Sequence, residues 1–396
     1  MLLRKHTVGL FLLLLLQAVF APAQNTDSVI TGAEQVTEYV PLILKKKIAV
    51  VANQTSIVGK THLVDVLLSI NMNLVKIFTP EHGFRGDADA GEKFDNSVDV
   101  LSGLPIISLY GLHKKPTRDD LKDIDIVIFD LQDVGTRFYT YIGTLQYVME
   151  ACAENKKQLI ILDRPNPNGY YVDGPVLDKK FSSFVGMNPI PVVHGLTVGE
   201  YAQMLNGEKW LSGGLTCDVK IIKVKNYTHK TLYKLPIKPS PNLPNMSAVY
   251  LYPSLCFFEG TVVSLGRGTE LPFQVIGYPG FTEGPYSFTP KSIKGMAVKP
   301  LYENVKCNGF DLREFGDNYI PTLKQLYLFW MKNIFDNYQD KNKFFNDFFD
   351  KLAGTDQLRK QIISGTSEDD IRKSWQPDLK KYKQMRKKYL LYEDFE

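Results

Sequence analysis

Residues 74–143 read LVKIFTPEHGFRGDADAGEKFDNSVDVLSGLPIISLYG and, after a short connection, DIDIVIFDLQDVGTRFYTYIG. Three short apolar runs in this stretch have the length and composition of buried strands: Leu74–Phe78, Leu104–Leu109 and Ile124–Phe129. Polar clusters follow two of them, at Glu81-His82-Gly83 and at Asp130–Asp133. The carboxyl ends of parallel strands form the ligand crevice of an open α/β sheet, so these clusters predict a site at one sheet edge.

Two more predicted strands, one on each side of this stretch, also end in polar loops. Lys47–Ala52 precedes Asn53-Gln54, and Gln158–Leu162 precedes the loop DRPNPNG at 163–169. Helical patterns alternate with the strands, at His62–Ile70, from Thr117 as a cap, at Thr144–Ala153 and at Thr197–Leu205. Repeated βα units bring strand ends to one edge, so four polar loops are expected to converge there.

We therefore predict an α/β fold in two domains. A Rossmann-like N-terminal domain with a mainly parallel sheet spans residues 24–235, and a smaller α+β domain spans residues 236–396. The connection KLPIKPSPNLP (Lys234–Pro244) is rich in lysine and proline, and its PSPNLP part is polar enough to contact a ligand. Near the C-terminus, separate helices are predicted at Asp369–Trp375 and Leu379–Leu391, the first of them capped by Ser367 with Asp370.

The first 23 residues have the parts of a secretory signal peptide. Arg4 and Lys5 precede the apolar run Val8–Phe20, and Ala21-Pro22-Ala23 forms a small-residue cleavage site. The run is shorter than the roughly 20 residues of a membrane span, and no cysteine at the cleavage point offers a lipid attachment site. We expect a periplasmic or secreted protein that begins at Gln24 and has no stable membrane anchor.

Charge and cysteine content exclude several classes of protein. Loss of Arg4 and Lys5 lowers the formal net charge from +4 to +2, which gives no general affinity for polyanions, so no nucleic-acid partner is predicted. The cysteines follow no zinc-binding spacing and are expected to be isolated buried thiols: Cys152, Cys217, Cys256 and Cys307. The sequence does not define the oligomeric state.

Motifs for several cofactor-dependent or nucleophilic chemistries are missing. The sequence has no HExxH, no GxSxG, and no GxGxxG after its first strand. Gly59-Lys60-Thr61 resembles the end of a P-loop, but the first glycine of that motif would fall at Gln54. We predict no cofactor and no bound metal; a divalent ion held by Glu81, His82 and Asp130 or Asp133 is the alternative.

Acid–base chemistry by carboxylates remains, and glycoside hydrolysis uses two of them. Glu81 follows a buried strand and a proline, a partly desolvated position that suits a general acid. Glu92, on a glycine-flanked loop, is a candidate for the second carboxylate, and Asp133 is its rival because Arg137 nearby favours an ionised form. Asp130 and Asp133 have a structural alternative, which is to cap the next helix or to pair with Arg137.

Several long motifs in a fixed order resemble the exported exo-β-N-acetylmuramidases of the NamZ family, which is glycoside hydrolase family 171 and was formerly a domain of unknown function. The resemblance extends from about Ile48 to the C-terminus. The motifs are PEHGFRGDADAGEKF (80–94), FDLQDVGTRFYTYIGTL (129–145), LDRPNPNG (162–169), DGPVLD (173–178), PSPNLP (239–244) and FEGTVVSLGRGTELPF (258–273).

This resemblance implies removal of terminal N-acetylmuramic acid from the non-reducing ends of peptide-free peptidoglycan chains, in cell-wall turnover and salvage. It also implies a Rossmann-like domain that bears the site. Glu81 and Glu92 fall in one acidic motif of the family, and Asp130 and Asp133 in another. One departure is Val262, where relatives are expected to carry an amide; the change affects sugar affinity only if that amide contacts the sugar.

The implied substrate suggests roles for further residues. N-acetylmuramic acid carries a lactyl carboxylate, for which a guanidinium fork is the natural partner. Aromatic rings stack on pyranose rings, amides bond hydroxyl or acetamido groups, and an imidazole orients a neighbouring carboxyl. The predicted substrate-binding residues are accordingly Asn53, His82, Arg85, Asp130, Arg137, Tyr139, Arg164, Asn166 and Arg267. Tyr141 is a second stacking candidate, and core packing is the alternative for one of the two tyrosines.

Two other functions compete with hydrolysis of a glycoside. A non-catalytic muropeptide- or sugar-binding protein could use the same crevice, but binding alone would not require paired carboxylates. A metal-dependent esterase or deacetylase would lose its activity in a chelator.

Overall fold

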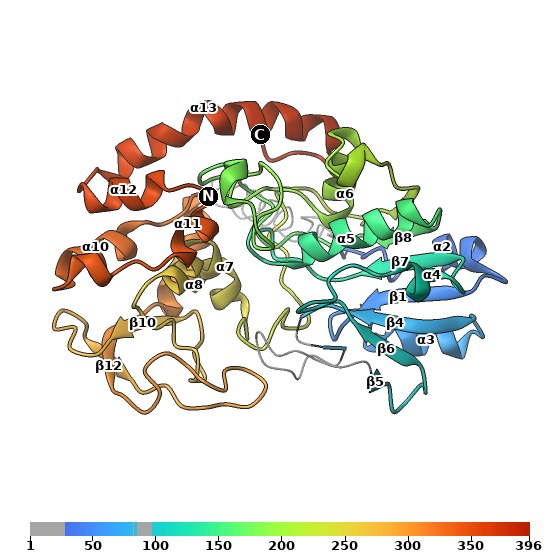
Figure 1. Cartoon of the computed structure of the whole chain (residues 1–396), viewed down its shortest axis with the longest axis horizontal. Coiled ribbons are helices and arrows are strands. Elements are labelled where there is room, and N and C mark those ends of the chain that lie inside the picture. Colours follow the sequence, from blue (N-terminus) through green and yellow to red (C-terminus); the bar gives the residue numbers. More distant parts are fainter. Residues whose placement is uncertain (1–27, 82, 85–96) are drawn as a thin grey trace, which may run out of the picture.

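The computed structural model describes residues 28–81, 83–84 and 97–396. Within these residues, the N-terminal part is built on a seven-stranded sheet with the order β5-β6-β4-β1-β7-β8-β9 (Figure 1). The strands are β1 (Ile48–Ala52), β4 (Leu74–Thr79), β5 (Ser97–Val98), β6 (Pro105–Ser108), β7 (Ile126–Asp130), β8 (Gln158–Leu162) and β9 (Val219–Ile222). Only the pairing of β5 with β6 among these strands is antiparallel, so the predicted mainly parallel sheet is confirmed.

Numbered along the chain, the described parallel strands have the order 3-2-1-4-5-6 of a doubly wound sheet. In this order the chain reverses direction across the sheet between β1 and β7, and ligands of such folds bind at that point. The central register pairs Val51 of β1 with Phe78 on one side and with Phe129 on the other. The loops after β1, β4 and β7 therefore start at neighbouring positions.

Helices cover both faces of the sheet, which explains why every residue of β1 is buried. Ala49 and Val51 pack in the core cluster that contains α5 (Tyr141–Glu154) and α6 (Val198–Gly207). Ile48, Val50 and Ala52 point the other way, into the cluster of α2 (Val36–Ile43) and α3 (Leu63–Ser69). Alternation along one strand thus supplies two hydrophobic layers.

Short-range signals placed several helix starts correctly. Thr117 caps α4 (Arg118–Leu121) in a capping box with Asp120, as its position predicted. Ser367 caps α13 (Glu368–Arg386) by accepting a hydrogen bond from the backbone N–H of Asp370. Among the described elements outside the large sheet, β2 (Ile57–Val58) and β3 (Thr61–His62) form a small antiparallel pair after β1.

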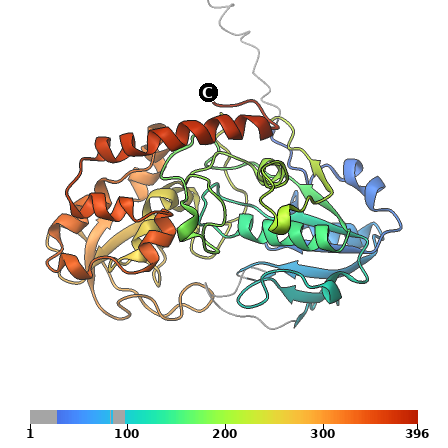
Figure 2. The ribbon, with the colours of Figure 1, turned by 45° about the horizontal axis from the view of Figure 1, so that its top comes forward.

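The prediction of two separate helices near the C-terminus was wrong. α13 continues through Pro377 as one helix and ends at Arg386 (Figure 2, in red). Ile371, Trp375, Leu379 and Tyr382 are buried at helical spacing, so packing of this face outweighs the lost hydrogen bond at the proline. Figures 1 and 2 both show α13 running along one side of the molecule, over its N-terminal and C-terminal parts.

The C-terminal part combines helices with a small antiparallel sheet. Within its described residues the sheet has the order β10-β12-β11. Its strands are β10 (Val275–Tyr278), β11 (Tyr286–Phe288) and β12 (Cys307–Asp311). Its helices are α7 (Met246–Leu255), α8 (Arg313–Asn318), α9 (Ile320–Leu323), α10 (Phe329–Asn337), α11 (Phe348–Ala353) and α12 (Gln357–Ile363). The predicted α+β character is confirmed, while the domain boundary at residue 236 stays a prediction.

Two further sequence expectations concern thiols and membranes. All four cysteines lie in the described part of the chain, and each is a buried free thiol, as expected. Over residues 28–81, 83–84 and 97–396, no helix combines the length and the apolar composition that crossing a bilayer requires.

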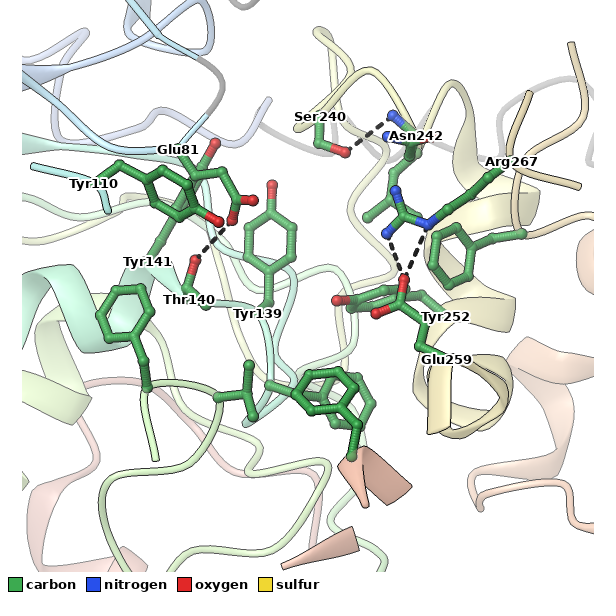
Figure 3. Close-up of a pocket in the computed structure, with 16 residues that line it drawn as sticks. Glu81, Tyr110, Tyr139, Thr140, Tyr141, Ser240, Asn242, Tyr252, Glu259 and Arg267 are labelled. Atoms are coloured by element: carbon green, nitrogen blue, oxygen red, sulfur yellow. Dashed lines mark hydrogen bonds and ion pairs between the residues drawn. The ribbon is translucent and has the colours of Figure 1, made fainter. Parts of the chain in front are cut away.

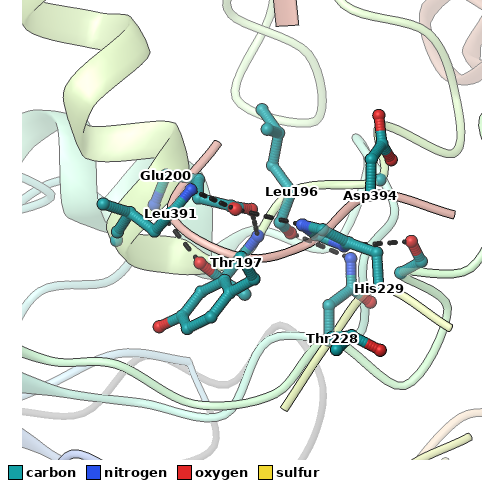
Figure 4. A network of polar contacts seen from close by, with 12 residues as sticks. Leu196, Thr197, Glu200, Thr228, His229, Leu391 and Asp394 are labelled. Atoms are coloured by element: carbon teal, nitrogen blue, oxygen red, sulfur yellow. Dashed lines mark hydrogen bonds and ion pairs between the residues drawn. The ribbon is translucent and has the colours of Figure 1, made fainter. Parts of the chain in front are cut away.

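After α13, the last residues of the chain return to the N-terminal sheet. The backbone N–H of Leu391 donates to Oε1 of Glu200 at 2.8 Å, and Nε2 of His229 lies 3.0 Å from the same oxygen (Figure 4). Arg386 is fully buried; it contacts both carboxylate oxygens of Asp394 at 2.9 Å and donates to the carbonyl of Gly195. The tail thereby satisfies polar groups that would otherwise be buried without partners.

Asp163, directly after β8, is enclosed by the same tail. Its carboxylate accepts hydrogen bonds from the Tyr392 hydroxyl at 2.6 Å, the Thr197 hydroxyl at 2.7 Å and the Gly199 N–H at 2.8 Å. Burial raises the pKa of Asp163 from 3.8 to about 6, although hydrogen bonds from Tyr392 and Thr197 lower it. The folded protein therefore holds a proton that the unfolded chain has already released between these two pH values.

This raised pKa predicts a loss of stability as pH increases. The contribution of Asp163 is most favourable below pH 3.8 and falls until the pH passes about 6. A pKa difference of this size between the folded and unfolded states changes the free energy of unfolding by about 3 kcal/mol. Urea unfolding of the wild type and of Asp163→Asn at several pH values between 4 and 7 measures it. We expect the wild-type free energy of unfolding to fall by about 2–3 kcal/mol relative to the variant as the pH rises; a difference that does not change with pH would contradict this account.

Candidate active site

A pocket of about 800 Å³, its open mouth included, lies between the N-terminal and C-terminal parts (Figure 3). Polar and aromatic side chains from distant segments line it. The polar ones are Glu81, Thr140, Ser240, Asn242, Glu259 and Arg267, and the aromatic ones are Tyr110, Phe138, Tyr139, Tyr141, Phe184, Tyr252, Phe273 and Phe348. Of the residues predicted for the site, Glu81, Tyr139, Tyr141 and Arg267 are therefore brought together here.

Glu81 enters the pocket from the loop after β4. The Thr140 hydroxyl, just before α5, donates to Oε2 of Glu81 at 3.4 Å. The Tyr110 hydroxyl, just beyond β6, is also hydrogen-bonded to Glu81, and burial together with the Glu81 charge raises the pKa of Tyr110. Loops that follow β4, β6 and β7 thus meet at one carboxyl. Of the four polar loops predicted to converge, however, only the one that carries Glu81 contributes a described side chain to the pocket lining.

An aromatic wall stands beside Glu81. The rings of Tyr139 and Tyr141 are 4.7 Å apart and meet edge to face. The hydroxyl of Tyr139 donates to the carbonyl of Pro239 at 2.9 Å, and burial raises the pKa of both tyrosines. Asn53 is fully buried and donates from Nδ2 to the Tyr141 hydroxyl at 2.8 Å. Asn53, predicted to contact sugar, instead lies behind the wall and holds Tyr141 in place.

The opposite side of the pocket is charged. Arg267 donates from Nε to Oε1 of Glu259 at 3.0 Å, and its Nη2 contacts the same oxygen. The guanidinium carbon of Arg267 lies 5.1 Å from the ring centre of Phe273. Ser240 and Asn242 come from PSPNLP, so the prediction that this connection touches the ligand site is supported by its place in the lining. Residues 240–242 and 259–267 lie far along the chain from Glu81, so this side of the pocket forms only when the two parts of the chain pack together.

Glu259, Tyr110 and Thr140 were missed by sequence reasoning. Glu259 stands eight residues before Arg267 in the same glycine-rich motif, so opposite charges within one motif were a usable signal. Tyr110 follows a predicted strand, and Thr140 lies between two tyrosines already considered for the site.

Other residues predicted for the site stabilise the protein around the pocket and do not line it. Asp130 and Arg164 form a buried bidentate pair, with Nε to Oδ1 at 2.6 Å and Nη2 to Oδ2 at 2.9 Å. Arg137 donates to three carbonyl oxygens, those of Pro175, Ile190 and Leu352, at 2.8–2.9 Å. These groups have partners inside the protein and do not line the pocket.

Asp133 and Asn166 also lie outside the pocket lining. Oδ2 of Asp133 accepts from the Gly135 N–H at 2.6 Å and lies 3.8 Å from Nε2 of the buried His194. Asn166 donates to the carbonyl of Leu196 and accepts from the Asn168 N–H. Both side chains hold the loops after β7 and β8. The structural alternative predicted for Asp133 was wrong in detail, because Asp133 bonds the Gly135 N–H and neither caps α5 nor pairs with Arg137, which is bound to carbonyl oxygens.

The remaining predicted site residues are His82, Arg85 and Glu92, and they lie outside the described residues. Val262, the one departure from the expected motif, bonds through its backbone to Phe344 and Tyr302 and does not line the pocket. In the part of the chain that the structure describes, no three His, Cys, Asp or Glu side chains gather closely enough to hold a metal ion.

Comparison with known proteins identifies the family. The model of the N-terminal part of exo-β-N-acetylmuramidase NamZ matches residues 48–247, and that of its C-terminal part matches residues 250–392. The peptidoglycan β-N-acetylmuramidase NamZ of Bacillus subtilis (strain 168) is 38% identical over 380 residues, which cover 90% of this chain and 89% of that protein.

Two solved structures from Bacteroides fragilis share the fold. One, the DUF1343 family protein BF0379, is 50% identical with a TM-score of 0.87 and covers 93% of this chain and 100% of its own. The other, BF0371, is 29% identical with a TM-score of 0.78 and covers 92% of this chain and 99% of its own. The two family models and the Bacillus relative span nearly the whole chain, and this protein belongs to the exo-β-N-acetylmuramidase NamZ family.

Proposed function

We propose that this chain is an exo-β-N-acetylmuramidase that releases terminal N-acetylmuramic acid from the non-reducing ends of peptidoglycan fragments, with Glu81 as the general acid. The observation that carries the assignment of Glu81 is its place: one carboxyl, held by the hydroxyls of Thr140 and Tyr110, faces a pocket walled by tyrosines. The peptidoglycan β-N-acetylmuramidase of Bacillus subtilis supports the reaction and the substrate class.

The surroundings of Glu81 suit a group that gives up a proton. Hydroxyls donate to a carboxylate and can turn to accept from a carboxylic acid, so Thr140 and Tyr110 orient Glu81 in both protonation states. In the reaction, the bond between the anomeric carbon and the glycosidic oxygen breaks, and the proton of Glu81 passes to the leaving oxygen. Water supplies the hydroxyl of the released sugar, as in other glycoside hydrolyses.

The aromatic wall formed by Tyr139 and Tyr141 is proposed to bind the sugar ring. Flat rings such as Tyr139 and Tyr141 offer an apolar surface for the pyranose, while the hydroxyl of Tyr139 is engaged by Pro239 and the ring is therefore fixed. A rigid wall positions the anomeric carbon over the acid without the entropic cost of ordering side chains on binding.

We further propose that the protein acts outside the cytoplasm, in cell-wall turnover and salvage. The signal-peptide pattern of residues 1–23 and the peptidoglycan-directed activity of the Bacillus relative support this location. Mass spectrometry of the protein recovered from outside the cytoplasm should find Gln24 at its N-terminus; full-length protein kept in the cytoplasm would refute it.

A direct assay tests the proposed reaction. Mature protein (residues 24–396) is incubated with the disaccharide MurNAc-GlcNAc and with intact peptidoglycan, and free N-acetylmuramic acid is followed by mass spectrometry. We expect release from the disaccharide, unchanged by EDTA. Binding of the disaccharide without release would instead favour a sugar-binding protein, and loss of activity in EDTA would favour a metal-dependent enzyme.

A further inference from the structure

The guanidinium of Arg267 is held rigidly and has donors left over. Glu259 accepts the Nε–H and one Nη2–H through a single oxygen, and Phe273 packs against the guanidinium face. A guanidinium has five N–H donors, so the two on Nη1 and one on Nη2 remain. None of these has a hydrogen-bond partner among the described residues, and the Arg267 side chain is 30% exposed, toward the pocket that it lines.

Asn242, which lies beside Arg267 in Figure 3, has an unpaired hydrogen-bond acceptor, whereas Arg267 has unpaired donors. Its Nδ2 donates to the carbonyl of Met296 at 2.9 Å, and its backbone N–H donates to the Ser240 hydroxyl at 3.1 Å. These contacts fix the amide, whose Oδ1 is buried without a partner in the described part of the protein. The residue is only 2% exposed. An acceptor buried in this way is destabilising unless a water or a ligand donates to it, so Asn242 offers Oδ1 to a bound N–H or O–H group.

We propose that Arg267, Asn242 and Glu259 form the subsite that distinguishes muramic acid from other amino sugars, an inference that rests on the proposed function. The free N–H groups of Arg267 bind the lactyl carboxylate on C3, and Oδ1 of Asn242 accepts the acetamido N–H on C2. These two substituents are neighbours on the ring, as the two side chains are neighbours in the pocket (Figure 3).

Glu259 acts in this subsite as a positioning residue. It touches Arg267 and fixes the plane of the fork, so the remaining donors face one direction before the substrate arrives. Of the other guanidinium groups considered for this task, that of Arg85 lies outside the described residues, and those of Arg137 and Arg164 are buried and bound to internal carbonyl or carboxylate oxygens. A lactyl group whose carboxylate is blocked as an amide would lose the charge-assisted bonds to Arg267.

Two chromogenic substrates separate recognition of the lactyl carboxylate from recognition of the other groups on the sugar. One is 4-nitrophenyl β-N-acetylmuraminide, and the other is its lactyl methylamide, which keeps the acetamido group and lacks the negative charge. We expect the wild type to prefer the acid about 10- to 100-fold in kcat/KM, the range for hydrogen bonds to a charged group. In Arg267→Met this preference should fall below about threefold.

The other variants give distinct expected patterns. Asn242→Ala should raise KM for both substrates by a similar factor, since both carry the acetamido group. Glu259→Ala should lower the preference for the acid mainly through KM, and Glu259→Gln, which keeps an acceptor oxygen, should restore most of it. Arg359→Met is the matched control, because Arg359 pairs with Asp350 at comparable exposure (31% and 19%, against 30% and 24% for Arg267 and Glu259).

The outcomes separate this inference from the proposed function. No turnover of either substrate by the wild type would overturn the proposed hydrolysis. Calorimetry would then still test the subsite, because the wild type should bind N-acetylmuramic acid more tightly than N-acetylglucosamine and Arg267→Met should not. Turnover with an unchanged preference for the acid in folded Arg267→Met would overturn the subsite alone. If that variant does not fold, Arg267→Lys, which keeps the charge and loses the fork, replaces it.

Discussion

Replacement of Glu81 by Gln is expected to lower kcat for release of N-acetylmuramic acid from MurNAc-GlcNAc by about 10²- to 10⁴-fold, with KM nearly unchanged. Gln keeps the shape of the side chain and can still accept the hydrogen bonds of Thr140 and Tyr110. It cannot transfer a proton to the leaving oxygen. Steady-state kinetics measure the effect, and Glu283→Gln, at an exposed position, is the control.

A substrate with a better leaving group makes this test specific for the acid role. A dinitrophenolate departs without protonation, so the loss of kcat in Glu81→Gln should shrink at least tenfold on dinitrophenyl β-N-acetylmuraminide. An equal loss on both substrates would assign Glu81 another role, such as orienting the sugar. A variant with wild-type turnover on the disaccharide would remove Glu81 from the mechanism.

Replacement of Asp130 by Asn is expected to reduce the free energy of unfolding by about 3–5 kcal/mol, since it leaves a buried guanidinium without its counter-charge. The side chains of Asp130 and Arg164 are 0% and 2% exposed, and two hydrogen bonds join them. Urea denaturation measures the loss. Asp178→Asn is the control, because Asp178 pairs with Lys180 at 49% and 59% exposure and its replacement should leave the free energy of unfolding nearly unchanged.

The same variant tests what Asp130 does. Because its carboxylate is occupied by Arg164 and does not line the pocket, KM of the folded Asp130→Asn enzyme should stay within about twofold of wild type. A stable variant with a KM raised tenfold would show instead that Asp130 contacts the sugar, as the sequence-based hypothesis supposed.

The sequence by itself determined the sheet, the sheet edge at which the candidate site lies, and the family. Apolar runs such as Ile124–Phe129 and the cap at Thr117 can be recognised in the sequence. The burial of a strand and the capping of a helix depend on residues that are only a few positions apart. Glu81 was predicted for the site for the same reason, since it stands two residues after the end of β4.

Only the tertiary structure decided which charged side chains face the pocket. Asp130 and Arg164 are 34 positions apart, and Arg137 reaches a carbonyl 215 positions away, so no local pattern announces that their charges are already satisfied. Arg267 and Glu259 enter from the far side only once the C-terminal part has packed. The continuity of α13 through Pro377 was decided in the same way, by burial of its face. A buried charge is destabilising unless it is paired with another group, because it has lost its contact with water. The fold determines which group lies close enough to pair with it.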